Sequence, residues 1–290
     1  MTFPNREPSP TITLTSDFGW RDGFVAAMKG VILGINPSVT LVDISHDIPP
    51  QNIAHGAFVL GTTCGYFPRG AIHLAVVDPG VGTARRPILL VTPDAFYVAP
   101  DNGLLTYVLM AHQARPNPGV AGTTEEDAVL RPTRALLPEA CSAYVLERDE
   151  YWLKPVSNTF HGRDVFAPVA AHLSNGVAPD ALGTRVEEIV CLNVPWPSEE
   201  KNVISGRVIH VDHFGNLASN IRSGDVIGSR VEVEVKGQRI RGLSLSYDSA
   251  TGLLAIVGSH GYLEIAERNG NASDLLGATV GTSIRITLID

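Results

Sequence analysis

Segments with strand-like and helix-like patterns alternate along the first two-thirds of this 290-residue chain, and no other feature constrains its fold as strongly. The run at 71–77 is apolar at almost every position, which is typical of a strand inside a sheet that is covered on both faces. The alternation therefore predicts a mostly parallel, layered α/β sheet. We expect strands at 11–15, 40–43, 71–77, 88–92 and 96–98, and helices at 23–35 with Asp22 as its N-cap, at 51–64 and at 164–173.

The pattern changes at residues 193–202, where two prolines and a cluster of charges indicate a linker. We therefore expect an N-terminal α/β domain at 1–197 and a smaller C-terminal domain at 203–290. Residues 115–138 are rich in Pro, Gly, Thr and charge, and we interpret them as a surface insertion. In the C-terminal part, short strands separated by Gly, Asn, Ser and Asp predict a small barrel or sandwich. These strands are expected at 203–211, 230–235, 253–257 and 282–288.

The charge balance argues against one large class of partner. Thirty acidic and 22 basic side chains give a formal net charge of -8, whereas proteins that bind the phosphates of nucleic acid need an excess of positive charge. The first ten residues lack the apolar stretch of a signal peptide, and no run of about 18 uncharged apolar residues suits a membrane-spanning helix. We therefore expect a cytoplasmic protein with no nucleic-acid or membrane partner. Cys64, Cys141 and Cys191 are far apart, and we expect reduced thiols without a function.

Two acidic residues follow predicted strands directly, Asp17 after the first strand and Asp78 after the strand at 71–77. Ligands of such sheets bind beyond the carboxyl ends of the strands, so this edge is the first place to expect a site. In the segment 78–85, glycines allow the chain to fold back and to bring Asp78 close to Arg85. An ordinary Asp-Pro-Gly turn explains the same residues, and the Lys-Ser/Thr pair of a phosphate-binding loop is missing.

His161 lies between a turn and a predicted helix start in the segment Thr-Phe-His-Gly-Arg-Asp. A single histidine is more often structural than catalytic, so its interest depends on whether it meets Asp78 and Arg85 in space. The segment 43–47 also combines acidic residues with a histidine, His46, but Ile-Pro-Pro follows it. We interpret that segment mainly as loop architecture.

The segment 212–217 holds an acid, an aromatic ring and a carboxamide within a few residues. Such a set suits a nucleoside, with Asp212 on the ribose hydroxyls, Asn216 on the base edge and Phe214 against the base. A polar hairpin turn with one buried Phe is the alternative. His210, Asp212 and His213 do not form a convincing metal site, because on a strand His213 would point away from the other two.

Seven motifs, taken together and in order, resemble one family, the S-adenosyl-L-methionine (SAM) hydrolase or hydroxide adenosyltransferase family, which also contains the SAM-dependent fluorinase and chlorinase. The resemblance extends from about residue 11 to 288. The motifs are Thr-Ser-Asp-Phe-Gly at 15–19, His-Asp-Ile-Pro at 46–49, Val-Asp-Pro-Gly-Val-Gly-Thr at 77–83, Pro-Asp-Asn-Gly-Leu at 100–104, Thr-Phe-His-Gly-Arg-Asp at 159–164, Asp-His-Phe-Gly-Asn at 212–216 and Gly-Tyr-Leu-Glu-Ile-Ala at 261–266.

The resemblance implies a C-terminal β-barrel-like domain and a homotrimer whose active sites lie between the N-terminal domain of one subunit and the C-terminal domain of the next. It implies that SAM and water give adenosine and L-methionine, with SAM as substrate and with neither cofactor nor metal. By motif position, Asp78, Arg85 and His161 serve the water. The implied substrate contacts are Asp17, Asp212, Phe214, Asn216, Ser259, Glu264 and Asn271, although Asn269 can be aligned in place of Asn271.

Other functions remain open at this stage. In the halogenases of the family, residues that shape a halide pocket replace the Asp and His, and a carboxylate at Asp78 would repel a halide 4 Å away by about 4 kcal/mol at an effective dielectric constant near 20. A protein that binds adenosine without turnover and a metal-dependent hydrolase are further alternatives. The sequence does not reveal which of Asp78, Arg85 and His161 acts as the base.

Overall fold

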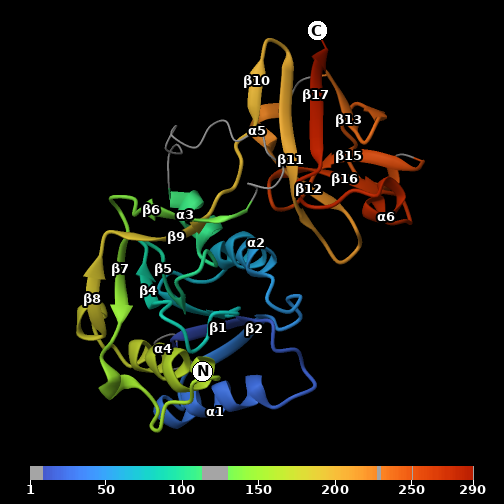
Figure 1. Cartoon of the computed structure of the whole chain (residues 1–290). Helices are drawn as coiled ribbons and strands as arrows, with labels where there is room; N and C mark the ends of the chain where they lie inside the picture. Colours follow the sequence, from blue (N-terminus) through green and yellow to red (C-terminus); the bar gives the residue numbers. More distant parts are fainter. Residues whose placement is uncertain (1–8, 113–129, 227–229, 250, 290) are drawn as a thin grey trace, which may run out of the picture. The chain divides into compact units, whose positions relative to one another are not determined.

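The structure is a computed structural model, which describes residues 9–112, 130–226, 230–249 and 251–289. The described chain forms two compact units, the first with residues 9–112 and 132–192 and the second with Leu130, Arg131 and the residues from Asn193 on (Figure 1). We call them the N-terminal unit and the C-terminal unit and describe each by itself. The finer domain limits of 1–197 and 203–290 stay a prediction. No helix among these residues is long and apolar enough to cross a membrane.

The N-terminal unit is built on a seven-stranded sheet. Its first four strands in spatial order are parallel, and its last three are antiparallel to their neighbours. The predicted α/β class with a parallel sheet is confirmed, and the structure adds the antiparallel half. In spatial order the strands are β2 (Thr40–Ser45), β1 (Thr11–Ser16), β3 (Ala71–Val76), β5 (Ala95–Pro100), β4 (Pro87–Val91), β7 (Ser142–Leu146) and β8 (Gly183–Val186).

Helices cover both faces of this sheet (Figure 1). α1 (Phe24–Ile35) packs with α4 (Ala167–Ser174) on one face, where alternate strand residues such as Ile12 and Leu14 join Met28 and Phe166 in a buried apolar core. α2 (Ile53–Thr63) and α3 (Thr106–His112) pack together on the other face. Short helical turns lie at Cys64–Tyr66, Asp149–Tyr151 and Pro179–Ala181.

Three predicted details of these elements are wrong. The N-cap of α1 is Gly23 and not Asp22, and no side chain caps this helix. α2 starts later than expected because Asn52 is its N-cap and accepts the backbone N–H of His55. The first residues of the helix expected at 164–173 belong instead to a wider π-helical turn over Gly162–Phe166, which leads into α4.

The expected surface insertion at 115–138 is only partly described, because residues 113–129 lie outside the described chain. Its last part contains a regular strand, which the interpretation as a surface insertion did not predict. β6 (Pro132–Leu136) pairs with β9 (Glu188–Leu192) in a two-stranded antiparallel sheet. This pairing was not visible in the sequence because its two strands are more than 50 residues apart.

The C-terminal unit is an antiparallel sheet that curls into the expected barrel-like shape. An isolated bridge from Ser244 to Ile256 links the segment after its first strand in spatial order to its last. Valine, leucine and isoleucine side chains fill its core. In spatial order the strands are β14 (Gln238–Arg241), β13 (Arg230–Val235), β17 (Ser283–Ile289), β11 (Val203–Val211), β12 (Leu217–Arg222), β16 (Tyr262–Glu267) and β15 (Leu253–Val257), with β10 (Ser198–Glu200) beside β11, and helical turns lie at α5 (Ser223–Val226), Tyr247–Ser249 and α6 (Ala272–Leu276).

Candidate active site

Three charged or titratable side chains meet just beyond the carboxyl end of β3. The Arg85 guanidinium donates Nε–H to both oxygens of Asp78, at 2.9 and 3.0 Å, and its Nη2 also contacts Asp78. The same Nη2 lies 2.9 Å from Nδ1 of His161. The side chains of Arg85 and Asp78 are only 9% and 6% exposed. The structure therefore brings together the three residues that the motifs placed around the water.

The glycine-rich segment after β3 makes this approach possible. Gly82 has a φ of +75°, and a Cβ at this position would lie 2.5 Å from the carbonyl oxygen of Asn158. A side chain here would therefore push the segment away from the turn that precedes His161. The glycine-rich segment forms its own turn through Thr83, whose backbone N–H and hydroxyl both donate to the carbonyl of Gly80. Arg85 is thereby turned back over Asp78.

His161 is held by the π-helical turn that follows it. The buried carboxylate of Asp164 accepts the backbone N–H of Ser157 at 2.8 Å and the guanidinium of Arg163, which fixes the loop on both sides of the histidine. Burial, followed by the positive charge of Arg85, lowers the pKa of His161, while Asp78 acts in the opposite direction.

The tautomer of His161 follows from its partner. Arginine carries only donors, so the Nδ1 atom of His161 must accept from Arg85, and the ring proton then sits on Nε2. The guanidinium carbon of Arg85 also lies 5.1 Å from the centre of the Phe166 ring. This ring closes the apolar side of the cluster and keeps water from the guanidinium face.

Asp17 lies at the end of the neighbouring strand β1. Its carboxylate accepts the backbone N–H of Gln51 at 2.7 Å. The next residue, Phe18, packs edge-on against Phe160 with ring centres 5.7 Å apart, and a Cβ at Gly162 would lie 3.3 Å from the Phe18 ring. The loop of Asp17 is thus packed against the turn of His161, so the predicted residues of the N-terminal unit share one edge of the sheet.

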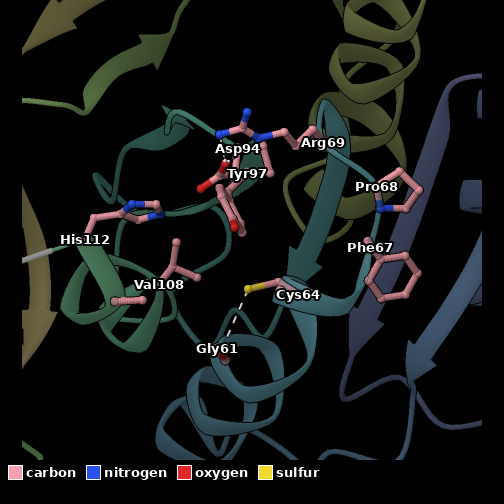
Figure 2. A pocket seen from close by; sticks show the side chains of 12 residues that line it. Gly61, Cys64, Phe67, Pro68, Arg69, Asp94, Tyr97, Val108 and His112 are labelled. Atoms are coloured by element: carbon pink, nitrogen blue, oxygen red, sulfur yellow. Dashed lines mark hydrogen bonds and ion pairs between the residues drawn. The ribbon is translucent and has the colours of Figure 1, made fainter.

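A separate cavity lies at the opposite edge of the same sheet (Figure 2). It encloses about 490 Å³ near the starts of β3 and β5, and its lining includes Cys64, Tyr97 and the Arg69–Asp94 ion pair. Burial raises the pKa of the Cys64 thiol, which keeps it protonated and unreactive. None of the predicted site residues lines this cavity.

The other predicted residues lie in the C-terminal unit, where Asp212 organises a tight turn. Its carboxylate accepts the backbone N–H groups of Phe214 and Asn216, at 2.9 and 2.8 Å, and the side-chain amide of Asn216 at 2.9 Å. The alternative interpretation of this segment required a buried Phe. The Phe214 ring is instead 72% exposed, so the turn presents an aromatic face to solvent.

Asn271 lies directly against this turn, and two further predicted residues lie on β16 and the loop before it. A Cβ at Gly215 would overlap the Asn271 amide, which also accepts the backbone N–H of Asp274. The buried Glu264 lies on β16 and pairs in register with Ala218 of β12. Ala218 is two residues after Asn216. Ser259 is exposed in the turn that leads into β16.

Glu264 has two side-chain partners that the sequence did not predict. The hydroxyl of Tyr247 donates to one oxygen at 2.8 Å, and Nε2 of His260 lies 3.1 Å from the other. Burial, together with this carboxylate, raises the pKa of Tyr247 to about 12. Neither residue stands in a recognisable motif, so only the contacts of the folded chain reveal them.

Comparisons with known proteins place the chain in a family. Residues 12–183 match the model of the SAM hydroxide adenosyltransferase N-terminal domain, and residues 206–285 match that of the C-terminal domain. A Salinispora tropica protein named (R)-S-adenosyl-L-methionine hydrolase is 39% identical over 97% of this chain and 98% of its own length. A fluorinase of Nocardia brasiliensis is 26% identical over 96% of both chains.

A solved structure extends the likeness to the fold. The crystal structure of an uncharacterised conserved protein from Thermotoga maritima superposes with a TM-score of 0.80 at 33% identity, covering 95% of this chain and 99% of that one. The matched domains span most of the chain, and all the motifs that carry the resemblance lie inside them. The chain belongs to the SAM hydroxide adenosyltransferase family.

Proposed function

We propose that this enzyme hydrolyses SAM, with water attacking C5′ of the ribose to give adenosine and L-methionine. The buried cluster of Asp78, Arg85 and His161 at the carboxyl edge of the sheet carries this proposal. The chain is also more similar to proteins named hydrolases than to those named fluorinases. Because the names of the hydrolases specify the (R) form of SAM, we propose that this sulfonium epimer is a substrate.

The leaving group departs easily. The C5′–S bond breaks with its electron pair moving to sulfur, which turns the positively charged sulfonium into the neutral thioether of methionine. The new C5′–O bond forms from a water oxygen on the opposite side of the carbon. The difficulty is the nucleophile, because free water has a pKa of about 15.7 and must be held in line.

We propose that Asp78 accepts the proton that this water loses. Attack by neutral water first gives a protonated 5′-hydroxyl group on C5′, which is a very strong acid, so even a carboxylate is basic enough to accept its proton. Arg85 does not occupy all the lone pairs of Asp78, because a carboxylate accepts about four hydrogen bonds. His161 is a poor candidate for the base, since its Nδ1 lone pair already faces Arg85.

Arg85 and His161 then position the nucleophile. The planar guanidinium fixes the carboxylate through two parallel hydrogen bonds, so that its free lone pairs point in one direction. His161 keeps an N–H on Nε2 that can orient the water. The site thus supplies orientation and a proton acceptor without a metal or cofactor, which we propose are not required.

Substrate contacts and assembly complete the proposal. We assign Asp17 and Asp212 to the ribose, and we propose that the enzyme works in the cytoplasm as a homotrimer with active sites between subunits. Remote contacts of this kind hold C5′ in line with the water and so contribute to the rate. The remaining proposed contacts are Phe214, Asn216 and Asn271 on the adenine side, Ser259 on the methionine part, and Glu264.

The structure changes one argument against halogenation. Asp78 on its own would repel a halide. Arg85, however, forms an ion pair with this carboxylate and largely cancels its charge, so the repulsion is mostly lost. The halogenase alternative is disfavoured instead by the lower identity to fluorinases.

Isotope labelling tests the reaction directly. The purified enzyme is incubated with each sulfonium epimer of SAM in oxygen-18 water, and adenosine and methionine are analysed by mass spectrometry. We expect one labelled oxygen in the 5′-hydroxyl of adenosine and none in methionine, with equal rates in the presence of a chelator. A 5′-halogenated nucleoside in the presence of chloride or fluoride, or binding of adenosine without turnover of either epimer, would contradict the proposal.

A further inference from the structure

The loop that carries Asp17 is tied to the segment after β2 by three hydrogen bonds. Ser16 Oγ lies 2.7 Å from Nδ1 of His46, and the backbone N–H of Gly19 donates to the carbonyl of His46 at 2.8 Å. Between them, the Asp17 carboxylate accepts the backbone N–H of Gln51 at 2.7 Å. The residue before Asp17, Asp17 itself and the second residue after it are therefore all held by residues 46–51.

His46 is the centre of this arrangement. Its side chain is completely buried, and its Nε2 lies 3.0 Å from the carboxylate of Asp43. Lys29 on α1 donates to the other oxygen of Asp43 at 2.6 Å. Burial acts to raise the pKa of Asp43, but the hydrogen bonds from Lys29 and His46 outweigh it and lower this pKa. Asp43 therefore stays ionised and anchors the imidazole.

The available donors and acceptors determine which group donates in each hydrogen bond between Asp43, His46 and Ser16. An ionised Asp43 only accepts, so Nε2 of His46 carries a proton. Ser16 Oγ accepts the backbone N–H of Phe18 at 3.3 Å, which leaves its own proton for Nδ1 of His46. A neutral imidazole satisfies both partners at once, and the Ser16 hydroxyl is locked in one orientation.

The set Ser16, His46 and Asp43 has the composition of a hydrolase triad but cannot act as one. Ser16 is completely buried, so its hydroxyl does not reach a substrate. The imidazole is also reversed, with Nδ1 on the serine and Nε2 on the carboxylate, whereas in nucleophilic triads Nε2 faces the serine. The arrangement holds a loop in place and does not attack a substrate.

We propose that Ser16 and His46 are positioning residues for Asp17, and that through this carboxylate they set the affinity for the ribose of SAM. This inference rests on the proposed function only in the identity of the ligand. The three residues of the chemical cluster are on other loops, so loss of the Ser16–His46 bond weakens binding more than it slows the chemical step.

The same sheet contains a matched control. Thr13 on β1 and His73 on β3 form a second buried pair, with the hydroxyl 2.8 Å from Nδ1. It repeats the hydroxyl–imidazole contact three residues earlier on the strand. Among the described residues, however, the Nε2 atom of His73 has no hydrogen-bond partner, and the ring lies against Phe67 and Tyr97, which line the separate cavity.

The experiment compares Ser16→Ala with Thr13→Val in KM, kcat and Tm. Both variants leave a buried imidazole nitrogen without its hydroxyl, so we expect similar decreases in Tm. Ser16→Ala should raise KM for SAM and the Kd for adenosine about tenfold while kcat stays within about threefold. Thr13→Val should leave KM, Kd and kcat unchanged. Equal effects of the two variants on KM, or a decrease confined to Tm, would overturn the proposal.

A double-mutant cycle with Asp17→Asn tests whether Ser16 acts through Asp17. In that background Ser16→Ala should no longer change the adenosine Kd, because the carboxylate that it positions is already lost. Additive effects would overturn the inference. The Kd is measured by calorimetry and needs no turnover, so an enzyme that binds adenosine but forms none from SAM would contradict the proposed function alone.

Discussion

The two groups of candidate site residues differ in how far their contacts are already formed within the protein. In the N-terminal unit, Asp78, Arg85 and His161 are largely shielded from solvent and already bonded to one another. In the C-terminal unit, the polar atoms of the Asp212 turn satisfy each other, while the Phe214 ring is exposed. The N-terminal group is a charge network whose hydrogen bonds are already formed, whereas the C-terminal group is a binding surface that exposes its aromatic ring.

This difference follows from what each group must do. Charged groups that act on a reacting atom need fixed directions, and burial next to partners supplies them before substrate arrives. An aromatic face that binds a base gains its stabilisation only when the ligand covers it. Variants in the first group should therefore lower kcat, and variants in the second should raise KM.

The largest effect is expected for Asp78→Asn, which removes the proton acceptor and the charge that Arg85 binds. We expect kcat to fall about 1,000-fold, within the range typical of a lost general base, while KM changes less than about fivefold. Steady-state kinetics with adenosine detection measures both. The control is Asp94→Asn, the same substitution in the Asp94–Arg69 pair at the opposite edge of the sheet, which should leave both constants unchanged. Equal losses in kcat and in substrate affinity would show that Asp78 only holds substrate.

Arg85→Lys should produce the next largest effect. An ammonium group is a point charge and cannot reproduce the two parallel hydrogen bonds to Asp78 together with the contact to His161. We expect kcat to fall roughly 10- to 100-fold. Arg86→Lys is the neighbouring control, because Arg86 binds Asp101 and the backbone carbonyl of Glu188 and should affect Tm but not kcat. A rate close to that of the wild type would remove Arg85 from the chemical group.

The sequence predicted the N-terminal group better than the C-terminal one. Asp17 and Asp78 follow predicted strands directly, and the edge on which parallel strands end is fixed by their direction, so their proximity followed from the pattern. That Arg85 and His161 meet was only a hypothesis, because it depends on the close approach of Gly82 to Asn158, 76 residues further on.

Other features could not be predicted because tertiary contacts override the local pattern. β12 has a polar sequence, yet it is central to the barrel and its Asn220 side chain is buried. This amide accepts the backbone N–H of Arg207 and donates to the carbonyl of Pro195, just beyond the last regular pair of the two strands, Val208 and Ser219. The role of His46 was also underestimated, since a loop histidine reveals its partners only in the folded chain.

The pH dependence of kcat tests whether the N-terminal group works with a neutral imidazole. Burial and the charge of Arg85 lower the pKa of His161, so the neutral form prevails at pH 7 and is lost only as the pH falls through this lowered pKa, below about 6.5. We expect kcat to be flat from pH 7 to 8 and to fall up to about tenfold per pH unit on the acid side. His161→Asn should lower kcat and move this acid limb. A wild-type profile that rises toward acid pH would contradict the assignment.

The smallest effect is expected for the open surface, in Phe214→Ala. Loss of an aromatic contact of about 0.5–1.5 kcal/mol corresponds to a KM that is about 2- to 12-fold higher, with kcat nearly unchanged. Tm should not change, because the ring is mostly exposed in the folded chain. Leu245→Ala, at another exposed apolar side chain of the same unit, serves as the control and should leave KM unchanged. A fall in kcat without a rise in KM would mean that Phe214 contributes to the chemical step, and the contrast between a finished network and an open binding surface would fail.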